Sequence, residues 1–138
     1  MRAARGLIDT NVLIRLAELD RESLPTVSVI STVTLAELTA GPLIAHDPRE
    51  RALRQSHVQL AEGDFEALPF DARVARAYGR VAADLRSAGR KTSARAFDAL
   101  IAATALAHNL PLYTANPDDF AAIGGLDVRA VREREASA

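Results

Sequence analysis

The chain has 138 residues, 49% of them hydrophobic, and a formal net charge of −1 at pH 7. These values suit one domain with a sizeable core and exclude a disordered or fibrous chain, and no apolar run is long enough to cross a bilayer. The absence of cysteine excludes disulfides, thiolate metal sites and a cysteine nucleophile, and it fits a reducing cytoplasm.

Short apolar runs alternate with segments of helical periodicity along the whole chain. Strands are predicted at residues 7–8, 27–30, 65–70, 110–113 and 126–131. Helices are predicted at about residues 12–17, 32–44, 48–60, 72–88 and 93–108, with a helical turn at 118–123 and a charged tail at 132–138. This alternation predicts an α/β fold with a central, mostly parallel five-stranded sheet, flanked by helices on both faces. We expect a single domain over residues 1–138.

Polar residues and breakers mark several helix ends. Asp47 is expected to cap a helix whose first residue is Pro48, and Asp71 is expected to cap the next one. Asn109 is a candidate for the left-handed conformation that ends a helix. Gly41-Pro42 is expected to kink or break the helix in which it lies.

Asp9 lies at the joint between the first strand and the first helix. In an open α/β sheet, ligands bind just beyond the carboxyl ends of the strands. The other interpretation is structural, because an aspartate at this position caps a helix by accepting from the next backbone N–H groups.

Two more acids lie in apolar helices. Asp98 is the only charged residue within residues 96–107, and a buried carboxylate is costly unless it is paired or bound to a metal. The alternative places Asp98 in a helix first turn, where the helix dipole favours an anion, or pairs it with Arg95. Glu37 lies among apolar neighbours, and its alternative role is a capping box with Thr34.

A further acidic stretch, residues 112–120, follows the fourth predicted strand. This stretch is expected to lie at the same edge of the sheet as Asp9. Turn formation alone would account for Asn116, Pro117 and Asp118.

Four motifs occur in order along nearly the whole chain: LIDTNVL at residues 7–13, STVTLAEL at 31–38, DALIAATAL at 98–106 and YTANPDDF at 113–120. Together they closely resemble those of the PIN-domain ribonucleases. Within that family the chain is similar to the VapC-type toxins of bacterial toxin–antitoxin pairs. The resemblance implies a PIN-like fold and an Mg²⁺-dependent endoribonuclease, with Mn²⁺ as a substitute ion.

By this resemblance, Asp9, Glu37 and Asp98 are the acidic ligands of the metal. Many relatives carry a fourth acid two residues after the threonine of the last motif, where this chain has Asn116. Asp119 is the nearest acid that would replace it, and we expect it to act in catalysis, through water.

Carboxylate oxygens are the ligands that hard divalent cations prefer, and such an ion lowers the pKa of a bound water and stabilises charge on a phosphate. Candidates for orienting water or carboxylates, or for touching the substrate, are Thr10, Asn11, Thr114, Asn116 and Arg95. The expected reaction is hydrolysis of an RNA phosphodiester by water.

The resemblance also implies partners. These are an RNA of the tRNA or rRNA class, whose cleavage inhibits translation, and a small VapB-type antitoxin that neutralises the toxin. A homodimer is also expected, and no association with a membrane is expected.

Functions of other classes fit the sequence less well than the nuclease. A phosphoacceptor receiver domain usually needs a lysine at a late strand end, and the only lysine, Lys91, precedes a helix. A haloacid-dehalogenase-like phosphatase would place its second aspartate at Asn11. A PIN-like fold retained only for binding is disfavoured, because all three main acids are present.

Overall fold

The computed structural model describes residues 4–90 and 96–136. Its five strands form one sheet of order β3-β2-β1-β4-β5, in which every neighbouring pair is parallel. The strands are β1 (Arg5–Ile8), β2 (Val27–Ser31), β3 (Ala67–Leu68), β4 (Leu112–Thr114) and β5 (Val128–Ala130). The predicted α/β fold with a parallel five-stranded sheet is therefore confirmed.

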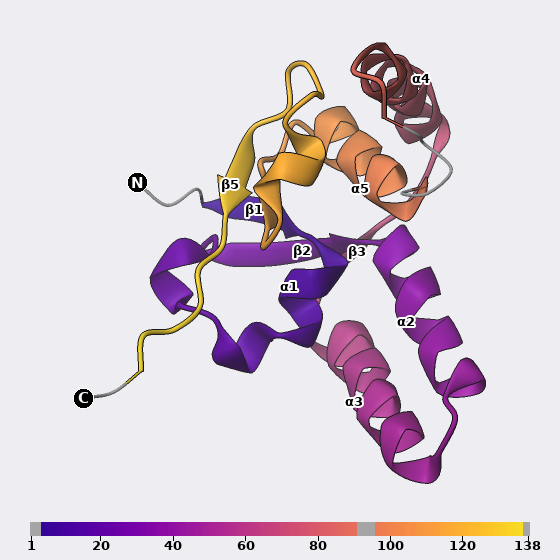
Figure 1. Ribbon diagram of the computed structural model, residues 1–138, viewed down its shortest axis with the longest axis vertical. Helices are drawn as coiled ribbons and strands as arrows, with labels where there is room; N and C mark the ends of the chain where they lie inside the picture. Colours follow the sequence, from indigo (N-terminus) through magenta and orange to yellow (C-terminus); the bar gives the residue numbers. More distant parts are fainter. Residues whose placement is uncertain (1–3, 91–95, 137–138) are drawn as a thin grey trace.

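Helices cover both faces of this sheet, with α4 and α5 on one side and α1, α2 and α3 on the other side of the view in Figure 1. The helices are α1 (Thr10–Ile14), α2 (Thr32–Ile44), α3 (Pro48–Asp64), α4 (Ala72–Ser87) and α5 (Ala96–Ala107). Short 3₁₀ turns are η1 (Leu16–Glu18), η2 (Arg21–Ser23) and η4 (Pro117–Phe120). None of the helices in the described ranges combines the length and apolar content that a membrane crossing requires.

Some predicted helix bounds differ from those observed. The helix expected at residues 12–17 ends at Ile14 and gives way to η1, whereas α3 extends beyond residue 60 to Asp64. Gly41-Pro42 does not break α2, which runs on to Ile44. The expected start of α5 near residue 93 lies outside the described residues.

The core consists of two apolar clusters, one on each face of the sheet. Leu7 packs with the residues of α4 and α5, and its neighbour Ile8 packs with Val12, Leu13 and residues of α3. Successive side chains of a strand point to opposite faces, so a strand buried on both faces is apolar at every position. This is why the end of β1, Leu7-Ile8, forms a short continuous apolar run in the sequence, whereas Arg5 at its start is exposed.

The predicted helix caps are present. The Asp47 side chain accepts from the Glu50 backbone N–H at 2.8 Å, and the Asp71 side chain accepts from that of Val74 at 3.1 Å. Pro48 is the first residue of α3. Asn109 has a φ of 56°, the left-handed conformation that follows α5.

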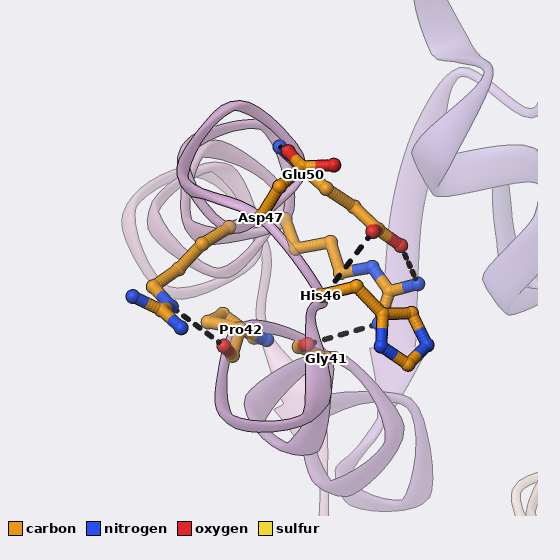
Figure 2. Close-up of polar contacts among 7 residues, drawn as sticks. Gly41, Pro42, His46, Asp47 and Glu50 are labelled. Carbon is orange, nitrogen blue, oxygen red and sulfur yellow. Dashed lines mark hydrogen bonds and ion pairs between the residues drawn. The ribbon is translucent and has the colours of Figure 1, made fainter.

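Helices α2 and α3 form a hairpin that is fastened at its turn (Figure 2). Helix ends leave backbone carbonyls without partners, and two arginines of α3 satisfy the last ones of α2. Arg54 donates to the Gly41 carbonyl at 3.0 Å, and Arg51 donates to the Pro42 carbonyl at 3.3 Å. Arg54 also pairs with Glu50. These contacts hold α2 against α3 and thereby help to place Glu37, which α2 carries.

The charged C-terminal segment is held on the fold rather than extended from it. The Asp20 backbone N–H donates to the Arg132 carbonyl at 2.8 Å, and the two side chains form an ion pair at 2.7 Å. Glu133 forms an isolated antiparallel bridge with Leu19. The final residues, 137–138, lie outside the described residues.

Candidate active site at the carboxyl edge of the sheet

The candidate site forms where the central strands end. β1 lies between β2 and β4, so its last residues have a neighbour on each side. Asp9 follows β1 directly, Thr114 ends β4, and α2, which carries Glu37, starts immediately after β2. Parallel strands bring these residues to one edge of the sheet, as the sequence predicts.

The Asp9 side chain is only 3% exposed and uses both carboxylate oxygens. Oδ1 accepts from the Thr10 backbone N–H at 2.9 Å, which makes Asp9 the N-cap of α1. Oδ2 accepts from the Thr114 hydroxyl at 2.9 Å, across the boundary between β1 and β4. Asp9 therefore does cap a helix, but the cap occupies only one of its two oxygens.

The surroundings of Asp9 disfavour its charge. Burial raises the pKa of Asp9 from 3.8 to about 6, and the negative charges of Asp98 and Glu37 contribute to the rise. The hydrogen bonds from Thr114 and Thr10 act in the opposite direction, because they stabilise the carboxylate. A carboxyl group that titrates near neutral pH within a group of acids is typical of a functional site.

Glu37 is partly buried on α2 and lies close to the same group. The Thr10 hydroxyl donates to its Oε1 at 2.7 Å. Burial raises the pKa of Glu37, and the charge of Asp98 raises it as well. The capping box proposed for Thr34 and Glu37 is wrong, because Ser31 caps α2 with its side chain and Thr34 lies inside the helix.

Asp98 lies in the first turn of α5 and is partly buried. Its charge acts on both Asp9 and Glu37, so the structure brings these three acids together from three separate elements. The first-turn position expected in the structural alternative is also observed, and the two roles are compatible. Arg95, the proposed ion-pair partner or phosphate contact, lies outside the described residues.

The stretch after β4 supports Asp9 through its backbone. The Asn116 backbone N–H donates to the Thr114 hydroxyl at 3.0 Å, while the Asn116 side chain is exposed and caps nothing in η4. The Asn11 side chain accepts from the Ala115 backbone N–H at 3.5 Å, which joins α1 to this loop. Asp119 is partly buried in η4, and its assignment as the fourth acid stays a prediction.

Three hydroxyl residues have contacts that the sequence did not indicate: Ser31, Thr34 and Thr104, each fully buried. From the sequence, Thr34 is expected only as a capping-box partner of Glu37. A polar residue within a motif that is otherwise apolar was the available signal. Thr104, for example, is the only hydroxyl in the apolar helix α5.

The donor set fits a hard divalent cation in its chemistry. Asp9, Glu37 and Asp98 supply carboxylate oxygens, and a cation would offset the mutual repulsion that raises the pKa of the first two. In their present positions, no three carboxylate or imidazole side chains of residues 4–90 and 96–136 converge closely enough to hold such an ion.

Fold and site together define an α/β domain with acids gathered at the carboxyl edge of a parallel sheet. The sequence model of the PIN domain matches residues 6–126, and the chain belongs to this family. Within the family, its similarity is to VapC proteins. It is 38% identical to "Ribonuclease VapC5" of Mycobacterium tuberculosis over 88% of this chain and 90% of that protein. It is 36% identical to "Ribonuclease VapC4" of the same organism, over 93% of this chain and 98% of that protein.

A solved structure agrees with this assignment. The crystal structure of VapBC-5 from Mycobacterium tuberculosis, described as a member of the VapBC family of toxin–antitoxin systems, matches with a TM-score of 0.79 at 36% identity. The match covers 94% of this chain and 98% of that one.

Proposed function

We propose that this protein is a metal-dependent endoribonuclease of the VapC type that hydrolyses RNA phosphodiester bonds. The observation that carries the proposal is the grouping of Asp9, Glu37 and Asp98 at the carboxyl edge of the sheet, where burial, together with the charges of the other two acids, raises the pKa of Asp9. The family supports the reaction class, since the relatives at 38% and 36% identity are named ribonucleases.

In this mechanism, Asp9, Glu37 and Asp98 hold Mg²⁺, with Mn²⁺ as a substitute. When such an ion is bound, the chemistry available at the site is activation of a water and stabilisation of negative charge on a phosphate. Thr114 and Thr10 keep the carboxylates of Asp9 and Glu37 oriented through the hydrogen bonds described above. Asp119 supplies the fourth acid and acts through water.

The test is cleavage of RNA by the purified protein, with and without EDTA. We expect EDTA to abolish cleavage and added Mg²⁺ or Mn²⁺ to restore it. Asp9→Asn and Asp98→Asn should each lower the rate greatly while the circular dichroism spectrum stays that of a folded protein. Undiminished cleavage in EDTA would contradict the metal-dependent mechanism. Unfolding of both variants would show that the acids are structural caps or ion-pair partners. Phosphorylation of the protein by a small phosphodonor would instead favour the receiver function.

We further propose that the protein is a toxin with a cognate VapB-type antitoxin as its partner, and that cleavage of tRNA or rRNA inhibits translation. The solved relative at 36% identity is described as a toxin–antitoxin system, which supports this partner class. A basic side chain of the antitoxin is expected near the acids, where charges are complementary. Expression of the chain alone without toxicity would count against the toxin role. We also expect a homodimer, and a monomer by light scattering at micromolar concentration would count against it.

A further inference from the structure

Several buried hydroxyl groups link the elements that carry the acids. The buried polar side chains within the described residues are Asp9, Ser23, Ser31, Thr34, Thr104 and Thr114. Burying a hydroxyl is costly unless it is hydrogen-bonded, so the partners of these groups show what they do. Thr114 binds Asp9 directly, which leaves the role of Thr34 to be explained.

Thr34 lies on α2, and its hydroxyl reaches across to α1. Thr34 Oγ1 is 2.9 Å from Thr10 Oγ1, and Thr10 Oγ1 donates to Glu37 Oε1 at 2.7 Å. A hydroxyl has a single hydrogen. Since Thr10 gives its hydrogen to Glu37, the hydrogen between the two threonines comes from Thr34. The order of donation is therefore Thr34 to Thr10 to Glu37.

This chain of hydroxyls is separate from the contacts that place α2. The start of α2 is fixed by Ser31, whose Oγ accepts from the Val33 backbone N–H at 3.0 Å and lies 3.2 Å from Thr104 Oγ1 on α5. The far end of α2 is fixed by Arg51 and Arg54 of α3. Loss of the Thr34 hydroxyl would thus leave the helix in place and affect the Glu37 carboxylate.

We propose that Thr34 is a positioning residue that acts through Thr10 to fix the orientation of the Glu37 carboxylate, one of the three acids proposed to bind a divalent cation. The inference rests on the proposed metal-dependent function and extends it to a residue that acts on the acids through another side chain. The Thr34 hydroxyl occupies an acceptor position on Thr10 Oγ1 and thereby favours the rotamer in which Thr10 donates its one hydrogen to Glu37. Removal of the Thr34 hydroxyl takes away this contact and loosens the orientation of the Glu37 carboxylate.

The experiment measures Mn²⁺ binding to the full-length, RNA-free protein by calorimetry, and RNA cleavage separately. Thr34→Val keeps the shape of the side chain and removes the hydroxyl, and Thr34→Ser restores the hydroxyl. Thr39→Val makes the same change at an exposed position of α2 and is the matched control. Partners that orient metal ligands change metal affinity by roughly 10- to 100-fold when removed, and we expect a loss at the lower end of that range.

The proposal predicts that Thr34→Val raises the Kd for Mn²⁺ by about 10-fold and lowers kcat with an unchanged KM for RNA, whereas Thr34→Ser and Thr39→Val behave like the wild type. A folded Thr34→Val protein with wild-type Mn²⁺ affinity would overturn the positioning role while leaving the proposed nuclease intact. A Thr34→Val protein with a lower melting temperature but unchanged Mn²⁺ affinity and kcat would also overturn the positioning role and leave the proposed nuclease intact. If the wild-type protein neither binds Mn²⁺ nor cleaves RNA, the proposed function fails, and the role of Thr34 fails with it.

Discussion

Replacement of Asp9 by asparagine should change the stability of the metal-free protein in a pH-dependent way. Burial and neighbouring charges raise the pKa of Asp9 from 3.8 to about 6 in the folded protein. Between pH 4 and 6, the folded protein therefore holds a proton that the unfolded chain has released. Its free energy of unfolding falls as the pH rises through this window, because the folded state binds more protons than the unfolded state.

The size of the effect follows from the two pKa values. At roughly 1.4 kcal/mol for each unit of pKa, ionisation of Asp9 costs the folded protein about 3 kcal/mol above pH 6. The asparagine side chain of the variant would carry no charge but would lose one of the two hydrogen bonds from Thr10 and Thr114, at about 1 kcal/mol. Asp9→Asn should therefore be about 1 kcal/mol less stable than the wild type near pH 3.5 and about 2 kcal/mol more stable near pH 7.

Urea denaturation in EDTA, from pH 3.5 to 8, measures this difference. We expect the free energies of unfolding of the two proteins to cross between pH 4 and 6. Added Mg²⁺ should then stabilise the wild type more than the variant, because a ligand that binds only the folded state raises its stability. If the difference between the two proteins is independent of pH, or if Asp9→Asn is less stable at every pH, the account of a crowded acidic site is wrong.

Two further predictions concern the sheet and the fourth acid. Gly6→Ala should destabilise the protein by about 1–3 kcal/mol, because a Cβ at Gly6 would lie 2.5 Å from Tyr113 Cε1; Gly63→Ala, with open space around it, is the control in the same urea titration. Asp119→Asn should raise the Mg²⁺ concentration for half-maximal cleavage. If the Mg²⁺ concentration for half-maximal cleavage is unchanged in Asp119→Asn but higher in Asn116→Ala, the fourth position belongs to Asn116 and not to Asp119.

The arrangement of strands and acids could be predicted from the sequence because it depends on local patterns. Apolar runs alternating with helical periodicity indicate a parallel sheet, and parallel strands bring their carboxyl ends to one edge. Asp9 was therefore expected at the same edge of the sheet as the acidic stretch that follows the fourth strand. The resemblance to PIN-domain ribonucleases then connected Glu37 and Asp98 to the same edge.

The hydroxyl contacts could not be predicted, because they join residues that are distant in sequence. Thr10 and Thr34 are 24 positions apart, and Ser31 and Thr104 are 73 apart, so only the packing of the helices decides whether they meet. The capping-box expectation failed for a related reason. The spacing from Thr34 to Glu37 fits that motif, but β2 ends at Ser31 and α2 begins directly after it, so the cap lies three residues earlier.

The most direct test of the central claim is the chemistry of the RNA ends produced by the purified protein in water enriched in ¹⁸O. If the acids at the sheet edge support attack by water, the new terminal phosphate carries ¹⁸O, the other fragment ends in a free hydroxyl, and Asp98→Asn gives neither product. Ends that carry a 2′,3′-cyclic phosphate without ¹⁸O would show that the RNA 2′-hydroxyl is the nucleophile and would contradict this account.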